Sequence, residues 1–424
     1  MERNRLLFCN RGNIDKKQRD LYGRIVDVLG EHYPDNEDWF FRFGYECNGP
    51  LYYGFCKWLS NKLKEKKYSK VFFLARDGYL IKSAYDLISS ESDYECEYLY
   101  ISRRAIHFPL LWLFPDVKCF LSLNSSKRWT YETLCNRLGL NKDDWIDYWQ
   151  ECGLSKEYSF SVNDVVQESK INTFLERTGH VADEESKSEF DLLLDYLVQE
   201  GMEGRIAIVD SGGFGTIHRC LLELIKRNYL NAEIDGYYMW SNDMNGLDYS
   251  CYGYDGKSIG ESHVLIEFPM TSFEGTTRSY KEKNARIVPC LDDFEYEKHE
   301  WVKNIVLQIQ SGTLYGVRVL SNSFNDYQFS AQIACHNINS SMWNPRTIET
   351  EMFGDIFFHS DCEDAFLAKP KELFYYICHP IRFLYDYKNA KWRIGYLKRI
   401  FKIPAPYYGF VRFTRVMFHL IRAK

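Results

Sequence analysis

The sequence predicts an α/β fold built around an open parallel sheet. Two segments, VFFL at residues 71–74 and IAIV at residues 206–209, are apolar at every position, as in central parallel strands that are buried on both faces. Each segment is followed by a short glycine-containing loop and then by apolar residues at helical spacing. Both therefore predict a strand, a loop and a helix, which is the repeating unit of open α/β sheets.

The remaining elements extend this core. Strands are expected at EYLYISRR, residues 97–104, which ends in a double arginine, and at IDGYYMW, residues 234–240. ESHVLIEFPMTSFEGTTRSY, residues 261–280, predicts an apolar segment followed by a polar loop. The predicted organisation is an N-terminal helical segment (1–44), a first half of the core (45–115), a helical insertion (116–199), a second half of the core (200–280), a C-terminal region with helical segments (281–390) and a basic aromatic tail (391–424).

Composition excludes several classes of protein. Of the 424 residues 45% are hydrophobic and 26% are charged, which is ordinary for a globular protein. The first 20 residues lack the apolar run of a signal peptide, and the longest apolar run, AIHFPLLWLF, is far shorter than the roughly 20 residues that span a bilayer. Thirteen cysteines without a CxxC pair predict reduced thiols rather than disulfides or a zinc site. We expect a cytoplasmic protein.

Charge is distributed unevenly along the chain. Residues 391–424 contain nine Lys or Arg and no acidic residue. Because the whole chain has a formal net charge of −6, the rest of the chain carries a net charge of −15. Basic residues interleaved with Trp, Tyr, Phe and Ile predict an interfacial segment on the inner face of an anionic membrane, or a cationic helix packed on the acidic body. Nucleic acid is not expected as a partner, because the acidic body would repel phosphates.

Two loops at the ends of predicted strands have the composition of ligand sites. In VDSGGFGT, residues 209–216, an acid ends the strand, and three glycines lead into a helix whose N-terminal N–H groups suit a phosphate. In ARDG, residues 75–78, an arginine, a carboxylate and a glycine suit a diphosphate with magnesium. A structural glycine turn and a surface ion pair between Arg76 and Asp77 are the corresponding structural interpretations. Both loops would lie at the carboxyl edge of one sheet, where such sheets bind ligands.

The order of these motifs resembles that of the type I phosphoribosyltransferases, with a diphosphate loop, a flexible loop and a loop for phosphoribosyl diphosphate (PRPP). The sequence is more similar still to the phosphoribosyltransferase modules of bacterial polysaccharide-biosynthesis proteins, in GPLYYGF, FFLARDGYLI, YISRR, VDSGGFGT and FEGTTRSY. Relatives in that group are often fused to haloacid-dehalogenase (HAD)-type phosphatases and labelled HAD-like hydrolases. The resemblance covers about residues 45–280 and implies an open parallel sheet of type I phosphoribosyltransferase-like, or Rossmann-like, topology with an inserted helical subdomain and a C-terminal helical extension.

The resemblance also implies roles for individual residues. Asp210 would bind the ribose hydroxyls of PRPP, and Asp77 and Asp210 would hold Mg²⁺. The 5-phosphate would be wrapped by Ser211, Gly212, Gly213, Phe214, Gly215 and Thr216, and the diphosphate would be met by Ala75, Arg76, Asp77 and Gly78, with Arg103 and Arg104 closing over it. The sequence departs from the family in having one acid, rather than two adjacent acids, in the PRPP loop and in the long insertion between the loops. Both departures argue against a nucleobase as acceptor.

The implied reaction transfers β-linked 5-phosphoribofuranose from PRPP to a sugar hydroxyl of a lipid-linked capsule or O-antigen intermediate. A sugar hydroxyl is a weak nucleophile, so a general base is expected, and Asp77 and Glu267 are the candidates. Glu267 has the simpler interpretation of a carboxylate closing a strand. The N-terminal segment shows no DxDxT-like motif, so a separate phosphatase would remove the 5-phosphate.

Three other functions remain open. A HAD-like phosphohydrolase requires a second Asp two residues after the nucleophile, where LARDGYL has Tyr79. A non-catalytic PRPP-binding regulator would keep the 5-phosphate loop and lose the residues that meet the diphosphate. A nucleotide-sugar glycosyltransferase with two Rossmann-like domains would bind a nucleotide in place of PRPP.

Overall fold

The computed structural model describes residues 6–9, 14–89, 94–114, 120–121, 123, 129–161, 169–241, 244, 246–253, 263–325, 327–358 and 365–422. Contacts divide the chain into two compact units. The first comprises residues 1–57, 255–269 and 296–424, and the second comprises residues 58–254 and 270–295. Three of the segments predicted from the sequence, 45–115, 200–280 and 281–390, are each shared between the two units.

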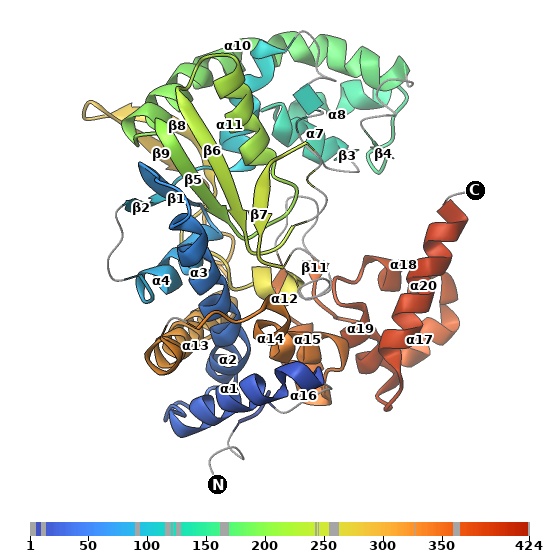
Figure 1. The fold of residues 1–424 in the computed structure, drawn as a ribbon. Helices are drawn as coiled ribbons and strands as arrows, with labels where there is room; N and C mark the ends of the chain where they lie inside the picture. The colour runs from blue at the N-terminus through green and yellow to red at the C-terminus, as the bar shows by residue number, and fades with distance from the viewer. Residues whose placement is uncertain are drawn as a thin grey trace. The chain divides into compact units, whose positions relative to one another are not determined.

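The second unit contains a five-stranded parallel sheet in the order β2-β1-β5-β6-β7, so the predicted α/β fold with a parallel sheet is confirmed (Figure 1). VFFL and IAIV form its central strands, as expected from their unbroken apolar runs. The strands are β1 (Lys70–Leu74), β2 (Glu95–Leu99), β5 (Gly204–Asp210), β6 (Ala232–Tyr238) and β7 (Tyr249–Cys251).

The strand order reverses direction at β1 and β5. The chain passes from β1 to the edge strand β2 on one side, whereas β5, β6 and β7 follow on the other side. β1 and β5 are paired in register from Lys70 opposite Ile206 to Phe73 opposite Val209. The loops that leave their carboxyl ends are therefore neighbours, and they lie at the switch point where open α/β sheets bind ligands.

Helices cover both faces of this sheet. On one face Phe72 of β1 and Ile208 of β5 share a buried core with α5 (Arg103–His107), α10 (Ser169–Gln199) and α11 (Thr216–Lys226). On the other face the ring of Phe73 lies 5.5 Å from that of Tyr85 in α4 (Gly78–Asp86). Burial on both faces explains why β1 has no polar residue between Val71 and Leu74.

Of the predicted helical insertion (116–199), the described residues 129–161 and 169–199 are mostly helical, as their spacing predicted. They pack around a second apolar cluster that includes Trp129, Trp149 and Phe174, and they belong to the same compact unit as the sheet. The elements here are the short paired strands β3 (Trp129–Thr130) and β4 (Ser159–Phe160), the helices α7 (Tyr131–Arg137) and α8 (Lys142–Glu151), and α10.

Two predictions of local structure were wrong. The strand predicted over residues 97–104 ends at Leu99, because the Ser102 side chain accepts a hydrogen bond from the Ala105 N–H (3.0 Å) and caps helix α5. The loop predicted at FEGTTRSY instead runs into β8 (Thr277–Lys283), which pairs antiparallel with β9 (Arg286–Leu291). The Tyr280 hydroxyl donates to the Tyr100 carbonyl oxygen (2.9 Å), which ties this hairpin to the sheet.

The first unit is largely helical. A buried hydrogen-bond chain links its early and late segments, because the Tyr22 hydroxyl donates to Asn337 Oδ1 (2.5 Å) and Asn337 Nδ2 donates to the Glu46 carbonyl oxygen (2.6 Å). Its helices are α1 (Arg19–Glu31), α2 (Trp39–Phe43), the start of α3 (Gly49–Leu63), α12 (His263–Glu267), α13 (Glu300–Phe324), α14 (Ala331–Ala334), α15 (His336–Trp343), α16 (Thr347–Gly354), α17 (Leu373–Cys378), α18 (Pro380–Asn389), α19 (Arg393–Phe401) and α20 (Tyr407–Arg422), with one small hairpin of β10 (Phe357–Phe358) and β11 (Ala365–Phe366).

Two further findings bear on the sequence-based expectations. In the part of the chain that the structure describes, none of the helices is both long and apolar enough to cross a bilayer. The described cysteines form no disulfide bond.

Candidate functional site at the switch point

The ARDG loop connects β1 to α4 at the carboxyl edge of the sheet. The Ala75 N–H donates to the Leu99 carbonyl oxygen (3.0 Å), which fixes the start of the loop against the end of β2, and the Ala75–Arg76 peptide bond is cis. Gly78 begins α4 so close to β1 that a Cβ atom there would lie 2.7 Å from the Phe73 carbonyl carbon. Asp77 stands at the N-cap of α4, and its side chain makes no capping hydrogen bond.

The glycine-rich loop connects β5 to α11 beside it. Gly212, Gly213 and Gly215 have φ angles of 155°, 109° and 70°, conformations that glycine adopts without steric cost. A Cβ atom on Gly212 would overlap the Trp240 carbonyl oxygen, whereas Gly213 faces open space. The loop thus brings backbone to the surface at the N-terminus of an 11-residue helix, where unpaired N–H groups favour an anion.

The Ser211 side chain joins the two loops. The Ser211 hydroxyl donates to Asp77 Oδ2, and the Ser211 N–H donates to Asp210 Oδ1 (2.8 Å). Ser211 therefore sits between two carboxylates, one from each loop. Ser211 has a structural role here, because it links the loops.

The electrostatics of this cluster are unusual. Burial, and then the negative charge of Asp77, raise the pKa of Asp210 to about 8, while the Ser211 N–H and the Arg103 guanidinium act in the opposite direction. Asp210 therefore retains its proton near neutral pH. A cation or a ligand hydroxyl would relieve the same repulsion, which is why perturbed carboxylate pairs often mark functional sites.

The carboxylate pair suits magnesium rather than a metal held by protein alone. Among the described residues no group of three or more His, Cys, Asp or Glu gathers as a metal site. Mg²⁺ is commonly held by one or two carboxylates together with substrate phosphates and water, so Asp77 and Asp210 form a fitting donor set.

The three predicted arginines, Arg76, Arg103 and Arg104, lie in different electrostatic environments. Arg76 forms an ion pair with Glu295, and their side chains are 23% and 10% exposed, respectively. Arg104 makes a bidentate ion pair with Glu189 of α10, with both N–O distances 2.9 Å, and stacks over the Phe108 ring. Only Arg103 acts electrostatically on Asp210 among these three.

The other predicted residues divide between the units. Ala75, Gly78, Phe214 and Thr216 lie in the two loops with Asp77 and Asp210, as the sequence indicated. Glu267 is the last residue of α12 and belongs to the first unit.

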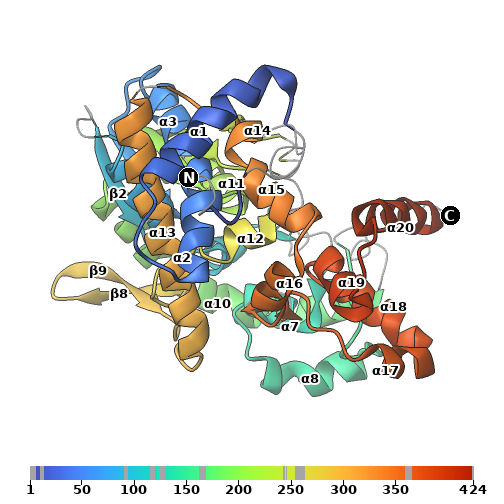
Figure 2. The ribbon, with the colours of Figure 1, turned by 90° about the horizontal axis from the view of Figure 1, so that it is seen from below.

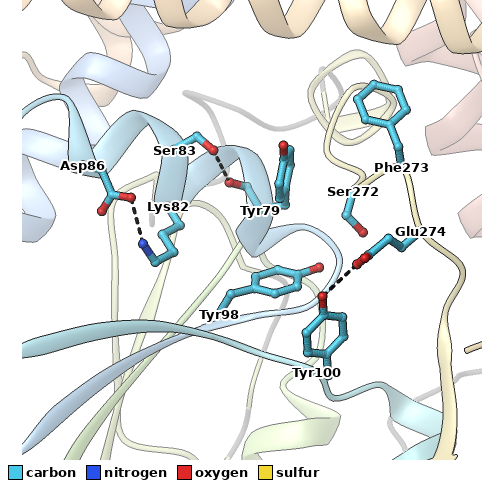
Figure 3. A pocket seen from close by; sticks show the side chains of 9 residues that line it. All are labelled: Tyr79, Lys82, Ser83, Asp86, Tyr98, Tyr100, Ser272, Phe273 and Glu274. Atoms are coloured by element: carbon cyan, nitrogen blue, oxygen red, sulfur yellow. Dashed lines mark hydrogen bonds and ion pairs between the residues drawn. The ribbon is translucent and has the colours of Figure 1, made fainter. Parts of the chain in front are cut away.

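A pocket of about 420 Å³ lies beside the ARDG loop in the second unit (Figure 3). The sequence did not predict the pocket as a whole, because its residues come from three separate segments and the third lies far along the chain from the other two. They are Tyr79, Lys82, Ser83 and Asp86 of α4, Tyr98 and Tyr100 at the end of β2, and Ser272, Phe273 and Glu274 before β8. Tyr79, Tyr100, Phe273 and Glu274 fall within motifs noted in the sequence, namely FFLARDGYLI, YISRR and FEGTTRSY.

Comparison of the full sequence with protein-family models found no match, and no curated protein is significantly similar to it.

Proposed function

We propose that this protein is a PRPP-dependent glycan phosphoribosyltransferase, which transfers 5-phosphoribofuranose to a sugar hydroxyl and releases diphosphate. The observation that carries the proposal is the joining of the ARDG and DSGGFGT loops at the switch point through Asp77, Ser211 and Asp210. A ligand with phosphate groups at both ends and a diol between them matches two anion-binding loops that flank a carboxylate pair.

Each loop has a part in this reaction. The N-terminus of α11 and the loop from Ser211 to Thr216 would hold the 5-phosphate, and Asp210 would accept hydrogen bonds from the ribose hydroxyls. The ARDG loop would hold the diphosphate. Arg76 would have to leave Glu295 to reach it, so we expect Arg103 and the loop backbone to make the first contacts. Magnesium, held by Asp77 and Asp210, would supply charge neutralisation of the leaving diphosphate.

The proposed reaction breaks one bond, forms one bond and releases one proton, so it needs one proton acceptor. The bond between C1 of the ribose and the diphosphate oxygen breaks, a bond from C1 to the acceptor oxygen forms on the opposite face, and the acceptor hydroxyl releases a proton. Asp77, whose carboxylate accepts a hydrogen bond from the Ser211 hydroxyl, is a candidate for this base, in which case it would take the acceptor's proton instead of holding magnesium. Glu267, the other candidate from the sequence, belongs to the first unit. The product keeps its 5-phosphate, so a separate phosphatase would complete an unphosphorylated ribofuranose.

The structure gives information on two of the three alternative functions and none on the third. Apart from the five-stranded sheet, the sheets in the described residues have two strands each, which gives little support to a glycosyltransferase with two Rossmann-like domains. Tyr79, which stands where a HAD-like phosphohydrolase needs its second Asp, lies in the first turn of α4. A non-catalytic PRPP-binding regulator would have the same 5-phosphate loop, so only a measurement of turnover distinguishes it from the proposed enzyme.

Calorimetry tests the proposal. The protein is titrated with PRPP and Mg²⁺, and in parallel with a panel of nucleotide sugars. We expect heat with PRPP only in the presence of Mg²⁺, and loss of binding in Gly213→Val, whose side chain would intrude where the loop backbone faces open space. Heat with a nucleotide sugar but not with PRPP would refute the proposal. Binding without diphosphate release, across a panel of lipid-linked glycans, would favour the regulator.

We also propose that the C-terminal helices attach the enzyme to an anionic membrane surface. Helices α17, α18, α19 and α20 pack in sequence (Figure 2). The exposed apolar side chains begin upstream of the predicted tail, at Phe374 (75% exposed) in α17 and Ile381 (83%) in α18, and continue at Phe410 and Phe413 in α20. The accompanying excess of Lys and Arg over acids supplies the charge complementarity to anionic lipid.

Sedimentation with vesicles tests the attachment. The double variant Phe374→Ser, Ile381→Ser should lose binding to vesicles that contain anionic lipid, and wild-type binding should weaken with added salt. Ile348→Ser in α16 is the matched control, since this isoleucine is also exposed (43%). Equal binding by the double variant and the wild type, or equal partitioning after deletion of residues 391–424, would refute the attachment.

A further inference from the structure

The pocket beside the ARDG loop is built from aromatic rings held in fixed positions. Tyr79 of α4 is 40% exposed and packs edge-on against Tyr98, with ring centroids 6.2 Å apart. Tyr98 in turn packs edge-on against Tyr100 (5.1 Å), and Phe273 packs edge-on against Phe294 (6.0 Å) on the opposite wall. Aromatic side chains present flat apolar faces at low conformational cost, which suits the C–H faces of a pyranose ring.

Polar groups around the rings suit hydroxyl groups. Glu274 accepts a hydrogen bond from the Tyr100 hydroxyl (2.9 Å), which orients both side chains at the pocket (Figure 3). A carboxylate has about four acceptor positions, so Glu274 retains capacity for sugar hydroxyls as donors. The pocket volume of about 420 Å³ falls in the usual range of small-molecule sites.

Charge decides which sugars are favoured. Lys82 Nζ lies 2.7 Å from Asp86 Oδ2, and these two charges offset each other within α4. Glu274 then leaves the pocket with one negative charge. An acidic sugar such as a uronic acid would be repelled by this carboxylate, whereas a neutral sugar would not.

We infer that this pocket binds a neutral sugar residue of the acceptor glycan. Helix α4 carries both the pocket wall, through Tyr79, and the end of the diphosphate loop, through Gly78. A sugar in the pocket would therefore lie beside the ligand of that loop. The assignment as an acceptor site rests on the proposed function, whereas sugar binding by the pocket stands on the pocket alone.

Saturation-transfer-difference NMR tests the inference with the full chain. The probes are the methyl glycosides of galactose, mannose and N-acetylglucosamine, together with methyl glucuronide as the acidic counterpart. Tyr79→Ala and Glu274→Gln remove one ring and one charge from the pocket. Tyr229→Ala is the matched control, because Tyr229 lies in the same unit, is exposed to a similar degree (38%) and also packs edge-on against one ring, that of Phe190.

We expect saturation transfer to at least one neutral glycoside, a loss of about two- to tenfold in affinity in Tyr79→Ala, and no loss in Tyr229→Ala. Absence of transfer to all neutral glycosides, equal binding by Tyr79→Ala, or stronger binding of the glucuronide to wild type would each overturn the inference. Calorimetry with PRPP on the same samples separates the two proposals. Sugar binding that depends on Tyr79 without any PRPP binding would support the pocket and refute the proposed function.

Discussion

Replacement of Asp210 by asparagine should change how the stability of the protein depends on pH. In the folded state burial and the charge of Asp77 raise the pKa of Asp210 to about 8, whereas in the unfolded chain an aspartate titrates at about 4. Between these values the folded state retains a proton that the unfolded state has released. The stability that this proton provides is fully present below the unfolded pKa and is lost as pH rises toward 8.

The size of the effect follows from the proton count. A difference of one proton between the two states changes the free energy of unfolding by about 1.4 kcal/mol for each pH unit. Asp210 is partly exposed as a residue, so solvent screening reduces the effect, and we expect about 2–4 kcal/mol between pH 5 and pH 8. An asparagine at this position cannot ionise, so the variant should gain that much relative to wild type over this range.

Urea unfolding at pH 5, 6, 7 and 8 measures the difference, with tryptophan fluorescence as the signal and EDTA present to exclude divalent cations. Asp235→Asn in the neighbouring strand β6 is the control. Although burial opposes it, hydrogen bonds from Lys66, Tyr68 and Arg205 lower the pKa of Asp235, so its stabilising effect is constant from pH 5 to pH 8 and is lost only under more acidic conditions. Parallel pH profiles for wild type and Asp210→Asn would refute the carboxylate pair.

Three further outcomes are expected. Asp77→Ala and Asp210→Ala should each lower diphosphate release from PRPP by about 100-fold or more, measured with a coupled diphosphate assay, and near-normal turnover in either would remove that residue from the site. Gly212→Ala should destabilise the protein by about 1–3 kcal/mol, measured by urea unfolding, because its Cβ would overlap the Trp240 carbonyl oxygen, and an unchanged midpoint would contradict the loop geometry. Arg104→Gln should cost about 1–3 kcal/mol in the same assay and leave PRPP affinity unchanged, since Arg104 pairs with α10, and weaker PRPP binding at full stability would instead give it a role at the site.

The fold could be predicted where burial alone determines the sequence. VFFL and IAIV needed no information beyond their own residues, since a strand buried on both faces has few alternatives. The end of β2 could not be predicted in this way, because Ser102 competes as a helix cap within a stretch of good strand formers. β8 was missed because TTRSYKEK is polar on its exposed side, and its buried positions, Thr277 and Tyr280, are too few to stand out.

The site could be predicted in part for a similar reason. Each loop is local in sequence, so its composition showed what it could bind. Partners that lie far away in sequence were not visible, as with Glu295, which engages Arg76 across 219 positions. The link from Ser211 to Asp77 was also not apparent, because it depends on the pairing of β1 with β5.

The threading of the chain limits how this protein can be divided for experiments. Residues 255–269 belong to the first unit, whereas residues 270–295, which follow them and include the β8–β9 hairpin, belong to the unit that contains the sheet. A fragment that stopped at residue 254 would lack the Thr277 carbonyl that accepts from Ser102 (2.5 Å) and would leave Arg76 without Glu295. Isolating the sheet therefore calls for a spliced gene in which a short linker replaces residues 255–269, rather than for a truncation.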